Sequence, residues 1–323
     1  MESLKSLKQI IDSAERIWLS SHVSPDGDSI GSLIGLGLAL ESLGKEVLLV
    51  NTDETPKLYQ FLAGAERILR PDQVSDLPDT VILVDCTDLK RVGPDLAERL
   101  SNVPMLVNID HHLSNSRFGH YNLVEEGAAA TAEIIVKLLG PFGIKINQTI
   151  ATALYTGIVM DTGSFQYSST TSETFRLAAV LLEQKVDLDL LRDKLFETQP
   201  LAQLKLLGEA LLNLKISANG KISWVEVDQE MLRRTGAKDE YCDGLINHPR
   251  SVAGVEIGML FREIPGEQIK VGLRSKGYAD VNQLAAQFGG GGHRRAAGCV
   301  VPGRMEEVVE RVLSAAEAAL RLA

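Results

Sequence analysis

Short apolar runs alternate with helical patterns through the first half of the chain. The runs lie at residues 17–21, 46–51, 81–86 and 105–110, and they are rich in Val, Leu and Ile. Continuous apolar strands that alternate with helices are typical of a parallel sheet with helices on both faces. The pattern therefore predicts an α/β fold for this half of the chain.

Helical patterns fill the segments between and after these runs. The first is a stretch of small and apolar residues that predicts a buried helix directly after a polar loop. The expected helices are 29–43, 57–68, 127–140, 148–160 and 168–184. Thr170 and Glu173 have the spacing of a capping box, which predicts the start of the last of these helices.

The second half of the chain has a different pattern. Residues 186–214 are almost wholly helical, with an interruption at Pro200. Alternating strand patterns follow at 221–227, 251–264 and 268–275, and then come a glycine-rich turn and a terminal helix at 304–322. We predict a first domain at 1–185, a helical linker at 186–215 and a smaller α+β domain at 216–323.

Composition narrows the classes of protein. The 323 residues carry a net charge of −10, which argues against a basic surface that holds long duplex nucleic acid but allows short nucleotides in a local cationic pocket. No apolar run reaches the roughly 18 residues of a membrane span, so we expect no membrane partner. Cys86, Cys242 and Cys299 are odd in number and far apart, which predicts a reducing, cytoplasmic location.

Three predicted strands end at a side chain that can bind a metal: His22, Asp85 and Asp110. Ligands of open parallel sheets bind at the carboxyl ends of the strands. More such side chains follow in the same loops and at the end of helix 148–160, namely Asp26, Asp28, His111, His112 and Asp161. A single Asp after a strand is more often a helix N-cap, and Asp28 is open to that interpretation. Capping does not explain three histidines at the same edge.

The donor set favours two divalent cations. Carboxylates and imidazoles suit hard or borderline divalent ions, and no thiolate is present to form a structural zinc site. Four aspartates contribute −4 and two dications contribute +4, so the cluster is neutral only when both ions are bound. Pro25 and Gly27 favour the tight turn that this crowding needs.

Five sequence motifs resemble one protein family. They are HVSPDGDSIGS (22–32), VDCTD (84–88), IDHH (109–112), DTGSF (161–165) and GGGGHRRAAG (289–298). The first four resemble the motifs of the DHH phosphoesterase superfamily, and the fifth resembles the signature of its companion domain, DHHA1. The resemblance spans nearly the whole chain. It is greatest to the branch of bifunctional oligoribonucleases (nanoRNases) that also act on 3′-phosphoadenosine 5′-phosphate (pAp).

The resemblance implies a DHH domain with a parallel sheet, a helical connector, a DHHA1 domain and an active-site cleft between the domains. It implies that His22 and Asp26 bind one Mn²⁺, with Co²⁺ or Mg²⁺ as alternatives. It also implies that Asp28, His111 and Asp161 bind a second ion and that Asp85 bridges both. His112 would lie at the scissile phosphate, where Asp110 orients a histidine, so His112, Asp110 and Asp85 are the expected catalytic residues. Cys86, beside the bridging acid, is expected to be a small buried residue.

The glycine-rich stretch is the predicted substrate-binding element. Bare N–H groups of consecutive glycines can cradle a phosphate, whereas the simpler alternative is a flexible hairpin with solvated arginines. The expected substrate-binding residues are Gly290, Gly291, Gly292, His293, Arg294, Arg295, Arg274 and Arg250. Which of Arg294 and Arg295 faces the substrate is left open, as is whether Arg262 faces it at all.

The resemblance implies a hydrolase that cuts oligoribonucleotides of two to five nucleotides to mononucleotides and converts pAp to AMP. Its partners would be short RNA and 3′,5′-bisphosphate nucleotides, and a homodimer is compatible with the sequence. Alternatives are a phosphodiesterase of linear or cyclic dinucleotides (pApA, cyclic di-AMP), a manganese pyrophosphatase, and a nucleotide sensor without turnover.

Overall fold

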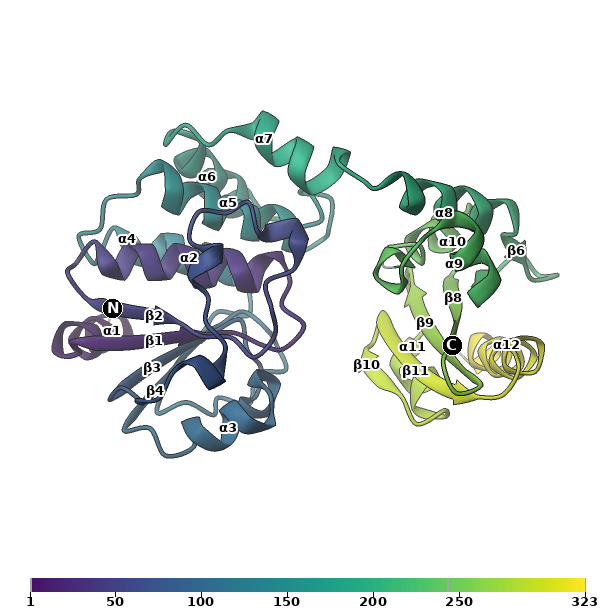
Figure 1. The fold of residues 1–323 in the computed structure, drawn as a ribbon, viewed down its shortest axis with the longest axis horizontal. Coiled ribbons are helices and arrows are strands. Elements are labelled where there is room, and N and C mark those ends of the chain that lie inside the picture. Colours follow the sequence, from purple (N-terminus) through teal and green to yellow (C-terminus); the bar gives the residue numbers. More distant parts are fainter. Residues whose placement is uncertain (1, 243, 323) are drawn as a thin grey trace. The chain divides into compact units, whose positions relative to one another are not determined.

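The structure, a computed structural model, describes residues 2–242 and 244–322. It divides into two compact units, of which the first ends at Thr198 and the second begins at Gln199 (Figure 1). This division falls inside the segment predicted as a helical linker, 186–215. The boundaries 1–185 and 216–323 stay a prediction.

The first unit is built on a five-stranded sheet in the order β2-β1-β3-β4-β5, and all of its neighbouring strands are parallel. The strands are β1 (Arg16–Ser20), β2 (Glu46–Leu49), β3 (Thr80–Val84), β4 (Met105–Asp110) and β5 (Tyr121–Val124). The first four coincide with the predicted apolar runs. The edge strand β5 was not predicted, because only Leu123 of its four residues is buried and no apolar run marks it.

Helices cover both faces of this sheet, which confirms the predicted architecture (Figure 1). Side chains of β1 alternate between the faces: Ile17 and Leu19 join the larger hydrophobic cluster, and Trp18 joins the smaller one with α3. The helices of this unit are α1 (Glu2–Ser13), α2 (Gly27–Glu41), α3 (Pro94–Leu100), α4 (Thr131–Leu139), α5 (Gln148–Asp161), α6 (Ser172–Leu182) and α7 (Leu188–Arg192).

Glycines allow α2 and α5 to approach closely. A Cβ atom at Gly31 would collide with the carbonyl oxygen of Ala153, and one at Gly157 would lie 2.8 Å from Asp28 Oδ1. The bare backbones therefore bring the start of α2, with Asp28, against α5, which ends at Asp161. This packing places two acidic side chains from distant parts of the sequence in one site.

Two local predictions are wrong. The helix expected at 57–68 is instead two short 3₁₀ helices, η1 (Lys57–Tyr59) and η2 (Ala65–Arg67), because Gly64 adopts a φ of +105° that ends helical geometry. The N-cap of α6 is Thr171 and not Thr170, since its hydroxyl accepts from the backbone N–H groups of the first turn. The reciprocal partner is Thr174, whose hydroxyl accepts from Thr171 N.

The second unit holds a six-stranded mixed sheet in the order β10-β11-β9-β8-β7-β6. Its strands are β6 (Lys215–Ile216), β7 (Ile222–Val227), β8 (Ile257–Ile264), β9 (Gln268–Ser275), β10 (Gly291–His293) and β11 (Ala296–Pro302). Its helices are α8 (Leu201–Leu212), α9 (Gln229–Thr235), α10 (Asn247–Ser251), α11 (Val281–Ala286) and α12 (Met305–Leu322). A stripe on α12, Val308, Val312 and Ala316, is fully buried against this sheet. Within the described residues, no helix is long and apolar enough to cross a membrane.

Candidate active site

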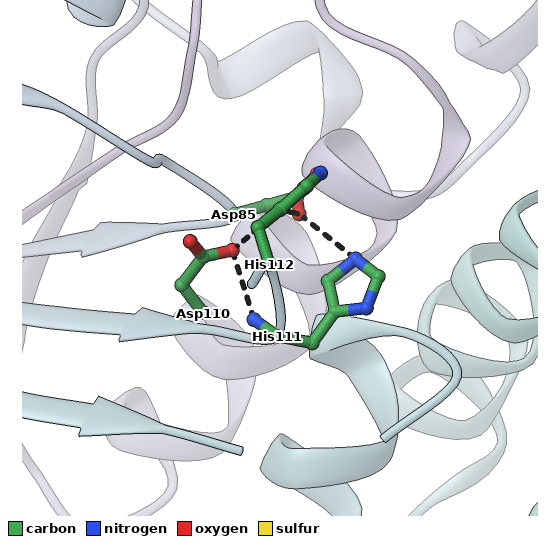
Figure 2. A group of neighbouring side chains, drawn as sticks. All are labelled: Asp85, Asp110, His111 and His112. Atoms are coloured by element: carbon green, nitrogen blue, oxygen red, sulfur yellow. Dashed lines mark hydrogen bonds and ion pairs between the residues drawn. The ribbon is translucent and has the colours of Figure 1, made fainter. Parts of the chain in front are cut away.

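The acidic and imidazole side chains meet at the carboxyl ends of the parallel strands. All six side chains predicted as metal ligands fall into two groups. Within each group, the candidate ligand atoms lie within 4.8 Å of one another. One group is His22, Asp26 and Asp85, and the other is Asp28, His111 and Asp161. A third, overlapping group joins Asp85, Asp110, His111 and His112 at the ends of two neighbouring strands (Figure 2).

Asp85 belongs to the first group and also faces the second. Its Oδ2 is 3.5 Å from His22 Nε2 in one group, and its Oδ1 is 3.7 Å from His111 Nε2 in the other. The residue follows β3 directly and has a φ of +56°, a left-handed conformation that is uncommon for a residue other than glycine. Such conformations concentrate at functional sites, where the surrounding structure holds them. The backbone therefore turns at the point where the carboxylate enters the cluster.

Asp26 and Asp28 each accept hydrogen bonds from the start of a helix and also face the cluster. Asp26 Oδ1 accepts from the backbone N–H groups of Asp28 and Ser29, so Asp26 is the N-cap of α2. Its second oxygen, Oδ2, is 3.9 Å from His22 Nε2. Asp28 does not cap α2, because its carboxylate accepts from the N–H groups of Thr131 and Ala132 at the start of α4. Capping and a role in the cluster are thus compatible in both residues.

The ring nitrogens of His22 and His111 reveal a need for a cation. His22 Nδ1 lies 2.8 Å from the carbonyl oxygen of Val23, and His111 Nδ1 lies 3.2 Å from that of Ala128. A carbonyl oxygen only accepts, so each Nδ1 carries a proton, and Nε2 is the ring atom that can bind a metal. His111 Nε2 is buried without a hydrogen-bond partner among the described residues, and it lies 3.2 Å from Asp161 Oδ2.

The carboxylates show the same need. Burial, followed by repulsion from Asp85, Asp161 and Asp26, raises the pKa of Asp28 well above its usual value. Burial likewise raises the pKa of Asp161 to about 6, despite the opposing effect of His111. Lone pairs and carboxylates that converge on the same space are stabilised by a metal cation, so the residues present fit divalent ions.

His112 and Asp110 form a separate hydrogen-bonded pair. His112 Nδ1 donates to Asp110 Oδ1 at 2.8 Å, and the same oxygen accepts from the backbone N–H of His111 (Figure 2). Burial lowers the pKa of His112, but the bond to Asp110 together with the charges of Asp85, Asp110 and Asp161 outweighs it, so the pKa rises to about 9. Asp110 is fully buried, and Asn115 Nδ2 donates to its other oxygen at 2.6 Å. Three donors on one carboxylate are typical of a residue that orients its neighbours.

Cys86 lies beside Asp85 and is fully buried, as expected. Burial raises the pKa of its thiol to about 12. The thiol is therefore protonated at neutral pH, and its carbonyl oxygen, which accepts from Asn115 Nδ2, is the part of the residue that supports the site.

The second unit contains a cavity of about 550 Å³ on its sheet. Three cationic residues line it, Arg262 on β8 and Lys270 and Arg274 on β9, together with Gly291 of the predicted glycine motif. Arg262 and Lys270 lie directly opposite one another on the adjacent antiparallel strands β8 and β9. The side chain of Arg262 is only 13% exposed, and its Nε is buried without a described hydrogen-bond partner.

Several predicted substrate-binding residues lie outside the lining of this cavity. Arg294 and Arg295 are exposed in the turn between β10 and β11, and Arg250 is half-buried on α10. The side chain of His293 lies outside the described part of the chain. Their roles in binding stay a prediction.

Two glycines of the motif are required by the backbone. A Cβ at Gly290 would collide with the carbonyl oxygen of Gly298 on β11. Gly292 has a φ of +150°, and a Cβ there would lie 2.5 Å from the carbonyl oxygen of Ala296. Close pairing of the hairpin thus accounts for part of the glycine pattern without any ligand.

The sequence interpretation missed Asn115, Thr131 and Lys270. Asn115 follows the DHH motif by only three residues, so its position was a usable signal. Thr131 contacts Asp28 and Asp85, which precede it by about a hundred and about fifty positions, and nothing local in the sequence marks it. Lys270 is one of several charged residues in an alternating strand, and only the sheet register sets it apart.

The site thus has the acids and imidazoles of a metal-dependent hydrolase, and they lie at the carboxyl ends of the strands of a parallel sheet. Residues 16–158 match the model of the DHH family N-terminal domain, and residues 223–322 match that of the DHHA1 domain. The chain belongs to the DHH family of phosphoesterases.

Particular relatives extend over nearly the whole chain. The bifunctional oligoribonuclease and PAP phosphatase NrnA of Thermus thermophilus is 34% identical over 97% of this chain and 93% of its own length. The protein with the same name in Bacillus subtilis is 31% identical over 89% of this chain and 90% of its own. The crystal structure of an exopolyphosphatase-related protein from Bacteroides fragilis is 30% identical, with a TM-score of 0.94 over 99% of this chain and 97% of that one.

Proposed function

We propose that this protein hydrolyses short oligoribonucleotides to mononucleotides and removes the 3′-phosphate of pAp to give AMP. The observation that carries the proposal is the position of Asp85 between two separate groups of acids and imidazoles. The bifunctional relatives named above, similar over nearly their whole length, support the choice of substrates.

We infer that two divalent ions, with Mn²⁺ as first choice, occupy these groups. His22 and Asp26 would hold one ion, Asp28, His111 and Asp161 the other, and Asp85 both. When bound, such ions supply Lewis acidity at the phosphate and neutralise the carboxylates. His111 Nε2 supports this inference, because it is buried without a hydrogen-bond partner among the described residues and faces Asp161.

His112 then acts on the leaving oxygen. Its Nδ1–H is held by Asp110, which fixes the ring orientation and leaves Nε2 for the substrate. Held in this way, the ring can carry a second proton at Nε2 and donate it to the oxygen that departs from phosphorus. Asn115 keeps Asp110 in place through the bond to its other oxygen.

The cavity of the second unit would bind an anionic or nucleoside part of the substrate. Arg262, Lys270 and Arg274 supply positive charge there, whereas the chain as a whole is acidic. A local cationic cavity on an acidic protein favours short nucleotides over long polyanions.

A substrate panel tests the proposal. The Mn²⁺-loaded protein is incubated with pAp, RNA of 2, 3, 5 and 24 nucleotides, pApA, cyclic di-AMP and pyrophosphate, and initial rates are compared. We expect pAp and the 2- to 5-nucleotide RNAs to be hydrolysed fastest. Faster hydrolysis of cyclic di-AMP or pyrophosphate, or no hydrolysis of any substrate, would contradict the proposal.

A further inference from the structure

The first turn of α4 contacts carboxylates of both groups. Thr131 N donates to Asp28 Oδ2 at 2.6 Å, and Thr131 Oγ1 donates to Asp85 Oδ1 at 3.1 Å. Thr131 is fully buried, and so is its neighbour Ala132, whose N–H donates to Asp28 Oδ1 at 3.0 Å. One residue thus joins an acid that follows β3 to an acid at the start of α2.

The residues just before this turn support the imidazole of the second group. The carbonyl oxygen of Ala128 lies 3.2 Å from His111 Nδ1. Ala129 N donates to Glu133 Oε2, and this bond links the residues before α4 to its first turn. Residues 128–132 therefore contact Asp28, Asp85 and His111, although no side chain among them is a candidate ligand.

The backbone and the side chain of Thr131 have separable tasks. The residue before it, Ala130, is the N-cap of α4 and has no side chain to accept from the free N–H groups. Asp28 accepts from these groups instead, through the backbone alone, so a substitution at residue 131 leaves this cap in place. The hydroxyl is needed only for Asp85.

We propose that Thr131 is a positioning residue whose hydroxyl orients the carboxylate of Asp85, so that this carboxylate can serve both metal ions. A neutral donor fixes one oxygen of Asp85 while it adds no positive charge that would repel a dication. Hydrogen bonds of this kind, to a ligand rather than to the metal, set ligand geometry and metal affinity. The proposal rests on the proposed metal site, and it concerns metal affinity directly and substrate choice not at all.

The test compares three variants of the metal-free full-length protein by calorimetric titration with Mn²⁺. Thr131→Val keeps the shape of the side chain and removes the hydroxyl, and Thr131→Ser keeps the hydroxyl. The matched control is Thr156→Val, because Thr156 is also fully buried in a helix and its hydroxyl donates to the carbonyl oxygen of Thr152, which is not a proposed ligand. Circular dichroism and a melting curve accompany each titration.

We expect Thr131→Val to weaken Mn²⁺ binding by roughly 10- to 100-fold, the usual range for loss of a partner to a metal ligand. Thr131→Ser should restore affinity to within a few-fold, and Thr156→Val should bind Mn²⁺ like the unmodified protein. At saturating Mn²⁺, Thr131→Val should recover most of its kcat with KM unchanged. Equal affinities of Thr131→Val and the unmodified protein would overturn the proposal, as would equal losses in Thr131→Val and Thr156→Val.

A second comparison asks whether Thr131 acts through Asp85. In an Asp85→Ala background, Thr131→Val should cause no further loss of Mn²⁺ affinity, because the partner of the hydroxyl is already absent. An additional loss as large as in the unmodified protein would show an effect on packing instead. If the protein binds Mn²⁺ as expected but hydrolyses no substrate of the panel, the proposed function fails while this inference stands.

Discussion

The two units present their charged residues in opposite ways. In the first, acids and imidazoles lie at the ends of parallel strands, and they include Asp85 and Asp110, which are almost fully buried. In the second, cationic residues such as Lys270 and Arg274 lie along one antiparallel strand and line an open cavity.

This difference predicts a different kind of ligand for each unit. Buried acids that repel one another need cations. Backbone N–H groups at a helix start donate to Asp28, and a backbone carbonyl oxygen accepts from His111. Cationic side chains that line a cavity favour an anionic ligand. We therefore expect substitutions in the first unit to remove the chemistry and substitutions in the second to weaken binding.

The largest effect should follow from Asp85→Ala. Because this carboxylate faces both groups, its loss should abolish hydrolysis of pAp and of short RNA alike, with the fold retained. Rates and circular dichroism are measured together, with Asp95→Ala in α3 as a surface control. Turnover in Asp85→Ala close to that of the unmodified protein would remove the basis of the two-ion site.

His111 and His112 are adjacent in sequence but should behave differently. His111→Ala should lose bound metal, because Nε2 of His111 faces Asp161 and Asp85. His112→Ala should retain metal and lose roughly 10²- to 10⁴-fold in kcat, the usual range for a positioned proton donor. Metal analysis and kcat of both purified variants decide the matter, and equal metal loss would refute this division of roles.

The first unit could be predicted largely from its sequence. Apolar runs marked β1 to β4, and the carboxyl ends of parallel strands must meet at one edge, so His22, Asp85 and Asp110 were predicted to meet there. The capping roles of Asp26 and Asp28 could not be assigned, because Asp28 caps a helix that begins about a hundred residues later. Contacts of that kind depend on packing, here on the close approach of Gly31 and Gly157.

The second unit was less predictable at its site. Gly290 and Gly292 satisfy the backbone of a hairpin, so their presence did not by itself mark a binding loop. Arg294 and Arg295 are the most conspicuous charges in the sequence, yet they are exposed in a turn. Lys270 becomes notable only because the register of β8 and β9 places it opposite Arg262.

An intermediate effect should follow from Arg274→Ala. Loss of one charge-assisted hydrogen bond should raise KM for pAp by roughly 10- to 100-fold with little change in kcat. Arg233→Ala in α9, matched in chemistry but exposed and paired with Glu230, should change KM by less than about 3-fold, the effect of a screened surface charge. Steady-state kinetics on pAp and on bis-p-nitrophenyl phosphate, which has a single phosphate and no nucleoside, test the pair. An equal loss on both substrates would show that Arg274 supports the fold.

The smallest effect concerns pH and the metal-free protein. Asp161 has a pKa raised to about 6, and the pKa of Asp28 is also raised, so the folded state binds more protons than the unfolded state above about pH 4. Stability of the metal-free protein should therefore fall as pH rises from about 4 to 7. His112, with a pKa of about 9, extends the fall above pH 7.

Melting curves of metal-free protein at pH 5.0 and 7.5 measure this trend. We expect a melting temperature a few degrees lower at pH 7.5, and a smaller difference in Asp161→Asn, which cannot ionise. Saturating Mn²⁺ should reverse the trend, because ionised carboxylates bind the metal. A metal-free protein that melts higher at pH 7.5 than at pH 5.0 would contradict the electrostatic account.

Electron paramagnetic resonance of the protein titrated with Mn²⁺ tests the central claim most directly. If Asp85 holds two ions at once, the protein should bind two Mn²⁺ per chain, and at saturation the ions should give the signal of an exchange-coupled pair. Asp85→Ala should lose that coupling. A single Mn²⁺ per chain at saturation, or two ions with uncoupled signals, would contradict a site in which one carboxylate serves both ions.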